Sequence, residues 1–261
     1  YVAPSVWARA PGRAAKLRPL FEEVLAVLPF EPAVMQRLQG PPTNYVGHPA
    51  LGERLVREMP ERGLLILLPG SRDGELRRHL PLFRTVLAEL GQHPAIDGVV
   101  IPTLPSLQER LMREVADWPV PVEIVSERIE RAGIYSNAVM ALAVSGTVTL
   151  ELALAQVPMV VTYVLDRTQA RIYASHGRPP VSLPNIILGR TAVPELVQAT
   201  PDAGAMLREV RALLDDKKAR QDQMTAFGEL ASVMETGDAG FPRQDPADRV
   251  LAHWHQRALS G

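Results

Sequence analysis

The sequence predicts an α/β fold built on a doubly wound parallel sheet. Three observations predict it: short apolar runs rich in Val, Ile and Leu, helical stretches that alternate with them, and glycines in the turns that follow two of the runs. The runs do not alternate with polar residues, as expected of strands that are covered on both faces. They occupy residues 64–68, 98–101, 122–125, 138–143 and 158–163.

Helical stretches fill the intervals between the expected strands, and this repeated order of strand and helix is typical of doubly wound domains. We expect these helices at about 73–90, 105–117, 128–136 and 147–156. After residue 194 the chain becomes helical, with helices expected at 202–214, 217–234 and 246–259.

The residues before 60 show a looser pattern. We expect a strand at 24–28, a short helix at 31–39 and another strand from Tyr45, with residues 59–63 as the joint to the sheet domain. The chain starts at Tyr1, and its first residues lack the basic start and apolar core of a signal peptide. We therefore expect a fragment that lacks N-terminal sequence.

The composition excludes several classes of function. The 261 residues carry a formal net charge of −1, whereas broad nucleic-acid binding needs a basic surface. The absence of cysteine excludes disulfides and cysteine-held metals, and it fits a reducing cytoplasm. No apolar run approaches the roughly 20 residues that span a bilayer, and the six histidines show no spacing typical of a metal site.

The loop after the expected strand 64–68 contains the candidate anion-binding residues Gly70, Ser71 and Arg72. Gly70 allows a sharp turn and a close approach to a ligand. Ser71 offers a hydroxyl, the following helix start offers backbone N–H groups, and the planar guanidinium of Arg72 matches a phosphate. The alternative is a serine helix cap beside a solvated arginine.

A second candidate loop, Ser145-Gly146-Thr147, follows the expected strand 138–143 and opens a helix. Its two hydroxyls and its glycine again suit an anion. Glu151 lies four residues after Thr147, which places it about 6 Å further along the same helix face. Glu151 could therefore accept hydrogen bonds from a ribose while the loop holds a diphosphate. The alternative is a buried glutamate satisfied by a neighbouring backbone group or arginine.

Two further residues are weaker candidates. Asn185 ends the polar segment Val181-Ser-Leu-Pro-Asn185, where its amide could contact a base or a phosphate, or close a turn. His48, in Gly47-His-Pro49, lies on a loop that could border a cleft, with a structural turn as the alternative.

Seven motifs in this order resemble the family of bacterial lipid-A-disaccharide synthases, which are inverting glycosyltransferases of the GT-B fold with two Rossmann-like halves. Each motif is weak alone, whereas their order and spacing over nearly the whole chain are specific. The motifs are Tyr1-Val-Ala-Pro-Ser-Val-Trp-Ala8, Leu28-Pro-Phe-Glu31, Val46-Gly-His-Pro49, Leu67-Leu-Pro-Gly-Ser-Arg72, Ser145-Gly-Thr-Val-Thr-Leu-Glu151, Pro158-Met-Val-Val161 and Ser182-Leu-Pro-Asn185.

The resemblance implies transfer of 2,3-diacylglucosamine from its UDP donor to 2,3-diacylglucosamine 1-phosphate, which gives the tetraacyl disaccharide 1-phosphate and UDP. It implies no metal and no other cofactor. The residues that it places at the UDP donor are Gly70, Ser71, Arg72, Ser145, Gly146, Thr147, Glu151 and Asn185.

The resemblance also implies an organisation and a location. Residues 1–60 would be a remnant of the N-terminal, acceptor-side domain, 61–240 the nucleotide-sugar domain, and 241–261 a helix that packs back on the N-terminal part. The protein would sit on the cytoplasmic face of the bacterial inner membrane as a peripheral protein, and a homodimer is compatible with the resemblance. A small basic cluster could meet anionic headgroups, with a solvated helix face as the alternative; it comprises Arg9, Arg13, Lys16 and Arg18.

Two departures from the family pattern affect the expected activity. The family's Trp-Ala-Trp-Arg is replaced here by Trp7-Ala-Arg-Ala10. The acidic general base of the family has no counterpart in this sequence, so the catalytic residue is expected in missing N-terminal sequence. A fragment that binds UDP-sugar without turnover, and a UDP-sugar epimerase, are the alternative functions.

Overall fold

The computed structural model describes residues 1–4, 11–127 and 130–260 of the chain, with side chains up to residue 255. Arg9, the whole of the Trp7–Ala10 departure and the start of the helix expected at 128–136 lie outside the described residues. The chain forms two compact units. Unit 1 comprises Tyr1–Gly52 and Glu229–Gly261, and unit 2 comprises Glu53–Gly228. The sequence-based boundaries were 60 and 240.

Unit 2 is built on a sheet of six parallel strands in the order β5-β4-β3-β6-β7-β8. The unbroken apolar runs of the sequence form its interior, and every residue of β6 is buried. This sheet confirms the predicted fold class. The strands are β3 (Gly63–Leu68), β4 (Ile96–Pro102), β5 (Val122–Val125), β6 (Ala138–Val144), β7 (Met159–Val164) and β8 (Glu195–Gln198).

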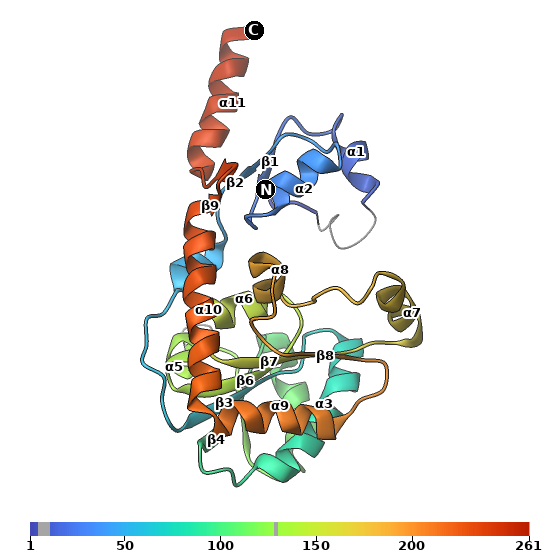
Figure 1. Cartoon of the computed structure of the whole chain (residues 1–261), viewed down its shortest axis with the longest axis vertical. Helices are drawn as coiled ribbons and strands as arrows, with labels where there is room; N and C mark the ends of the chain where they lie inside the picture. Colours follow the sequence, from blue (N-terminus) through green and yellow to red (C-terminus); the bar gives the residue numbers. More distant parts are fainter. Residues whose placement is uncertain (5–10, 128–129, 261) are drawn as a thin grey trace. The chain divides into compact units, whose positions relative to one another are not determined.

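Helices cover both faces of this sheet (Figure 1). Helices α3 (Asp73–Leu90) and α9 (Ala203–Asp215) contact each other and form one hydrophobic core with β3, β4 and β6. Helices α6 (Val148–Leu154) and α8 (Leu183–Leu188) contact each other and lie on the other side. The other helices of unit 2 include η2 (Pro105–Leu107), α4 (Gln108–Val115), α5 (Arg131–Ser136), α7 (Arg167–Ser175) and the first part of α10 (Lys217–Thr236).

The direction of winding reverses between β3 and β6. From β3 the chain continues outward to β4 and β5, then returns to place β6 on the other side of β3. Leu68 at the end of β3 pairs with Ala143 near the end of β6. In open α/β sheets such a reversal leaves a crevice outside the carboxyl ends of the two strands, where ligands bind.

Three elements of unit 2 were not predicted from the sequence. Helix α7 has no buried residue. Helix α8 is one short segment, with Pro184 in its first turn and Gly189 in the left-handed conformation at its end (φ +64°). Strand β8 lies at the edge of the sheet and is half-buried, so it lacks an apolar run.

Unit 1 contains a two-stranded parallel sheet and several helices. Strand β1 (Val24–Ala26) pairs with β2 (Thr43–Tyr45), and buried side chains that include Val24, Ala26 and Met35 form a small core. The other elements are α1 (Arg13–Leu17), α2 (Glu31–Arg37), η1 (Pro49–Glu53), the hairpin β9 (Gly237–Asp238) and β10 (Phe241–Pro242), and α11 (Pro246–Ser260). The last residues of α10 (Lys217–Thr236) also belong to this unit.

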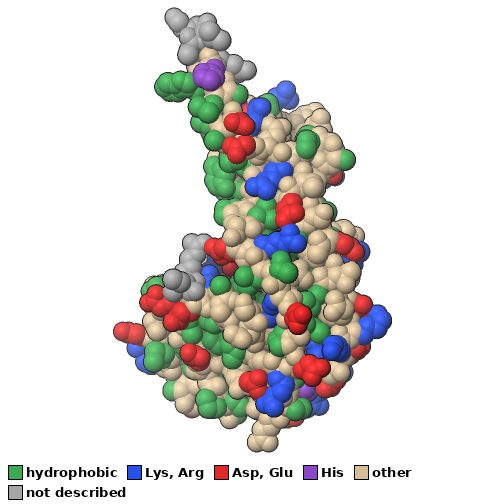
Figure 2. Space-filling model, turned by 90° about the vertical axis from the view of Figure 1, so that its left-hand side faces the viewer, with side chains coloured by type: hydrophobic (Ala, Val, Ile, Leu, Met, Phe, Trp, Pro, Cys, Tyr) green, Lys and Arg blue, Asp and Glu red, His purple; other side chains and the backbone are tan. Residues whose placement is uncertain are grey.

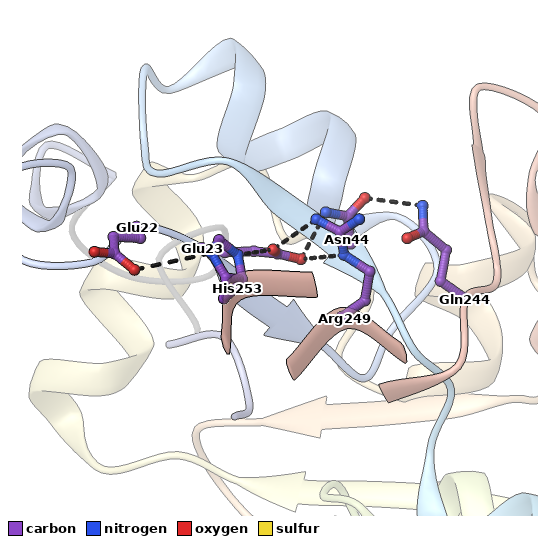
Figure 3. A network of polar contacts seen from close by, with 6 residues as sticks. All are labelled: Glu22, Glu23, Asn44, Gln244, Arg249 and His253. Atoms are coloured by element: carbon purple, nitrogen blue, oxygen red, sulfur yellow. Dashed lines mark hydrogen bonds and ion pairs between the residues drawn. The ribbon is translucent and has the colours of Figure 1, made fainter. Parts of the chain in front are cut away.

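Glu23 attaches the C-terminal helix to this small sheet (Figure 3). Arg249 donates to both carboxylate oxygens of Glu23 at 2.9 and 2.7 Å, and His253, one turn later on α11, contacts the same carboxylate. Asn44 of β2 donates to Glu23 at 2.7 Å and accepts from Gln244 at 3.1 Å. Burial raises the pKa of Glu23, but the hydrogen bonds from Arg249 and Asn44 outweigh it and lower the pKa to about 2.

Another face of α11 carries exposed apolar side chains. Val250, Leu251 and Trp254 are 59%, 51% and 72% exposed. The space-filling view shows apolar side chains along this helix, whereas acidic and basic side chains are interspersed over the face of unit 2 that it displays (Figure 2).

Candidate nucleotide-binding site

The two loops singled out from the sequence lie at the same edge of the sheet. One connects β3 to α3 and the other connects β6 to α6, and β3 and β6 are neighbouring parallel strands. The structure therefore places both loops at the reversal of the winding, where a ligand crevice is expected.

The loop after β3 turns through Gly70, whose φ is +95°. A Cβ atom at Gly70 would lie 2.5 Å from Oε2 and 2.7 Å from Cβ of Glu75, so only glycine fits. Glu75 Oε2 accepts hydrogen bonds from the backbone N–H groups of Ser71 and Arg72, at 3.1 and 3.3 Å. The Arg72 side chain donates to Glu75 Oε1 at 2.7 Å.

Glu75 thus accepts hydrogen bonds from backbone N–H groups of the β3 loop that we had expected to bind a phosphate. Burial raises the pKa of Glu75, but the hydrogen bonds from Arg72 and the loop lower it overall, so Glu75 is a carboxylate near neutral pH. The available groups of this loop are the Ser71 hydroxyl and the Arg72 guanidinium, whose side chain is 82% exposed. Glu75 could have been identified from the sequence, because a glutamate three residues after the helix cap has the spacing of a capping box.

His79 fixes the first turns of α3 against strand β7. Its Nε2 accepts from the backbone N–H of Val164 at 2.9 Å, so the ring hydrogen is on Nδ1, which donates to the carbonyl of Glu75 at 2.8 Å. Burial lowers the pKa of His79 and keeps the ring neutral. The sequence did not identify this role, which depends on a contact between distant segments.

The loop after β6 is more open. Gly146 is exposed, and a Cβ atom added there would meet nothing within 4 Å. Thr147 is also exposed and is the N-cap residue of α6. Ser145 is half-buried, and its hydroxyl donates to the carbonyl of Val181 at 2.6 Å, which leaves its oxygen able to accept but not donate in this arrangement.

Glu151 lies on α6 beside an arginine of α5. Its carboxylate is 4.0 Å from Arg131, and the two side chains are 28% and 30% exposed. Burial and then the charge of Glu151 raise the pKa of the neighbouring Tyr135 to about 12. Glu151 is thus a partly accessible carboxylate with a cationic neighbour.

Asn185 lies in the interior of the 181–195 segment. It is 3% exposed, and its Nδ2 group donates to the Val193 carbonyl at 2.9 Å and to Glu195 at 2.8 Å. Its Oδ1 atom accepts from the backbone N–H groups of Ala192 and Val193 at 2.6 and 3.0 Å. All four hydrogen-bonding positions of the amide are therefore used within the protein.

Glu195, at the start of β8, organises the same segment. Its carboxylate accepts from the backbone N–H groups of Val181 and Ser182, both at 2.9 Å, and from the Ser182 hydroxyl and Asn185. Because the Val181 carbonyl accepts from Ser145, Glu195 is linked through this segment to the β6 loop. The sequence did not identify Glu195, since it is the first residue of an edge strand that carries no motif.

His48 lies in unit 1 and forms a turn. Its Nδ1 atom accepts from the backbone N–H of Ala50 at 3.1 Å, and burial lowers its pKa. The preceding Gly47 has a φ of +91°, and the Arg243 side chain lies against it. These contacts describe a neutral histidine within a tight turn.

No group of three or more His, Cys, Asp or Glu side chains suited to a metal ion occurs within the described part of the chain. No helix within those residues is long and apolar enough to cross a bilayer.

Solved structures of low sequence identity share this fold. The chain aligns with the GtfA/B complex at 12% identity and a TM-score of 0.56, over 95% of this chain and 47% of that one. It aligns with WaaG, a glycosyltransferase involved in lipopolysaccharide biosynthesis, at 16% identity and a TM-score of 0.50, over 83% and 58% of the two chains. The parallel α/β architecture is therefore that of glycosyltransferases of the GT-B type.

Sequence comparisons define the family. The lipid-A-disaccharide synthetase family matches residues 1–238, and the chain belongs to this family. The lipid-A-disaccharide synthase of Rhodopseudomonas palustris strain BisB18 is 39% identical over 262 residues, covering 96% of this chain and 66% of that protein. The enzyme of that name from Nitrobacter hamburgensis is 39% identical over 266 residues, covering 98% and 67%. The chain thus spans about two thirds of the length of these relatives, and the resemblance seen in the seven motifs is confirmed.

Proposed function

We propose that the protein transfers 2,3-diacylglucosamine from its UDP donor to 2,3-diacylglucosamine 1-phosphate, releasing UDP and the tetraacyl disaccharide 1-phosphate. Membership of the lipid-A-disaccharide synthetase family supports this reaction. The observation that carries the site assignment is the open Gly146 loop beside the Gly70 loop, at the reversal between β3 and β6.

In this proposal the UDP diphosphate lies over Gly146, close to the backbone N–H groups and hydroxyls of the Ser145–Thr147 loop. The exposed guanidinium of Arg72 and the hydroxyl of Ser71 approach it from the β3 loop. Glu151, one turn into α6, accepts hydrogen bonds from the ribose. Arg72 stabilises the negative charge that develops on UDP as the glycosidic bond breaks, because a preorganised cation acts most strongly where charge develops.

Asn185 enters the proposed site as a positioning residue. Its amide is fully bonded within the 181–195 segment, whose Val181 carbonyl fixes the Ser145 hydroxyl. Gly70 likewise shapes the β3 loop, because only glycine leaves room for the Glu75 carboxylate. His48 holds its turn in unit 1, and no residue of the chain is assigned as the general base.

The donor and the acceptor both carry acyl chains, so we propose that the protein works at a bilayer surface, as a peripheral protein on the cytoplasmic face of the inner membrane. We also propose that the protein forms a homodimer, which light scattering would test.

Two measurements on the wild-type chain test this function. UDP binding is measured by calorimetry, and UDP release from UDP-2,3-diacylglucosamine is measured with and without 2,3-diacylglucosamine 1-phosphate. We expect saturable UDP binding and a release that depends on the acceptor. Binding without acceptor-dependent release would assign a donor-binding module, and absence of UDP binding would contradict the site.

A further inference from the structure

Residues 166–180 form an excursion from unit 2 that contains no buried side chain. The excursion leaves the carboxyl end of β7, forms α7 and ends at Pro180, just before the Val181 carbonyl that binds Ser145. It therefore stands at the same edge of the sheet as the proposed donor site.

The charge of this excursion is one-sided. It contains three arginines, Arg167, Arg171 and Arg178, all exposed, and a single acidic residue, Asp166. No ion pair or hydrogen bond engages the three guanidinium groups among the residues that the structure describes. The face of unit 2 in Figure 2 differs, because acidic and basic side chains are interspersed there.

Helix α7 has an outer and an inner face. Arg167 and Arg171 lie four residues apart and share one face, and Ile172, which is 54% exposed, adjoins them. The half-buried residues Gln169, Ala170 and Tyr173 lie on the inner face. The outer face thus combines two free cations with one exposed apolar side chain.

Local hydrogen bonds hold this face in place. Asp166 and Gln169 form a reciprocal capping box, at 2.8 and 3.0 Å, so the single carboxylate is committed to the helix start. The helix ends at Ser175, Gly177 beyond its C-cap adopts the left-handed conformation (φ +74°), and the backbone N–H of Arg178 donates to the carbonyl of Tyr173 at 3.1 Å. The arginines are therefore presented from an ordered scaffold rather than from a loose loop.

We propose that the outer face of α7 docks on the anionic headgroups of a lipid bilayer. Guanidinium groups bind phosphate oxygens through paired N–H donors. The exposed Ile172, which adjoins Arg171, inserts at the boundary of headgroups and acyl chains. Charge complementarity favours an anionic bilayer as the partner of this face, since the arginines have no acidic partner within the described residues.

This inference rests on the proposed function, because docking of α7 would hold the edge of the sheet that carries the donor site at the membrane surface that contains the acylated substrates. Each arginine near an anionic membrane strengthens binding by about 5-fold. Loss of Arg167 and Arg171 together should therefore weaken binding by about 30-fold. Binding should also fall with salt, because the Debye length is about 8 Å at physiological ionic strength.

The test is co-sedimentation of the full 261-residue chain with phosphatidylcholine vesicles, with and without phosphatidylglycerol. The variants are Arg167→Gln/Arg171→Gln and Ile172→Ser. The matched control is Arg208→Gln/Arg211→Gln, which removes two exposed arginines from α9 of the same unit. Melting temperatures of all four proteins establish that they are folded.

We expect the wild type and the control to bind the phosphatidylglycerol vesicles equally and to dissociate at high salt. The α7 double variant should bind about 30-fold more weakly, and Ile172→Ser should bind more weakly at every salt concentration. Equal binding by the α7 variant and the control, or no preference of the wild type for phosphatidylglycerol, would overturn the proposal. UDP titrations of the same proteins separate the two proposals, since a failure of the donor site abolishes UDP binding and leaves the vesicle result unchanged.

Discussion

Replacing Gly146 with alanine should separate ligand binding from folding. Gly146 is exposed, its φ lies outside the left-handed region, and a Cβ atom there would meet nothing within 4 Å. Such a substitution in a folded protein stabilises by about 0.4–1 kcal/mol, because alanine loses less backbone entropy on folding. For a unit of this size that corresponds to a rise in melting temperature of roughly 1–4 °C.

The added methyl group would occupy the space in which we place the diphosphate. It should prevent the close approach to the loop and cost at least one charge-assisted hydrogen bond, or about 1.5–3 kcal/mol. UDP affinity should therefore fall by about 10- to 150-fold while the melting temperature stays level or rises. Few other substitutions would change these two quantities in opposite directions.

Calorimetry and thermal unfolding of Gly146→Ala measure both effects. Gly228→Ala is the matched control, because a Cβ atom at Gly228 also meets nothing within 4 Å and Gly228 lies on α10, outside the proposed site. The control should keep its UDP affinity. Unchanged UDP affinity in a folded Gly146→Ala protein would refute the placement of the diphosphate.

Four further predictions follow from named contacts. Arg72→Ala should weaken UDP binding by about 10- to 150-fold, while changing stability by less than about 1 kcal/mol because the ion pair with Glu75 is largely exposed on the arginine side; an unchanged dissociation constant would remove Arg72 from the site. Glu151→Gln should weaken binding of UDP more than binding of pyrophosphate, and equal losses in calorimetry would limit Glu151 to a structural role. Glu195→Ala leaves the donors of Val181, Ser182 and Asn185 without their acceptor and should destabilise unit 2 by about 2–4 kcal/mol; a melting temperature within a degree of the wild type would contradict this network. The pKa of Glu23 is about 2 in the folded protein, against 4.5 for a glutamate outside the fold. The ionised carboxylate therefore stabilises unit 1 above pH 4.5, and this contribution disappears as the pH falls toward 2. The protection factors of the α11 amides against hydrogen exchange should therefore fall below pH 4.5 in the wild type, whereas in Glu23→Gln they should be low already at neutral pH.

The central strands and the long helix could be predicted because their signals are local. An unbroken apolar run identifies β6, and the predicted helix at 73–90 coincides with α3. Strand β8 could not be predicted, because a half-buried edge strand needs no apolar run. Helix α7 buries no side chain and lacks the apolar stripe by which helices are recognised.

The same distinction applies to the candidate site. The positions of the Gly70 and Gly146 loops follow from a general property of parallel sheets, so the sequence sufficed to place them. The partners of these loops required the structure. Glu75 binds the β3 loop from three residues beyond the helix cap, and this spacing can be recognised in the sequence. Glu195, in contrast, contacts Val181 and Ser182 only because β8 joins the sheet.

The burial of Asn185 has a similar cause. Its sequence context suits a ligand amide as well as a turn, and only the position of Val193 and Glu195 in the folded chain selects the turn. A polar residue in a motif can thus act on a site through the backbone that it holds.

The most direct test of the central claim is a titration of the isotopically labelled chain with UDP, followed by the backbone amide resonances. The account predicts saturable shifts that are largest at Ser71, Gly146 and Thr147, with smaller shifts along α6 toward Glu151. Shifts confined to residues away from the carboxyl ends of β3 and β6, with these amides unperturbed at saturation, would contradict it.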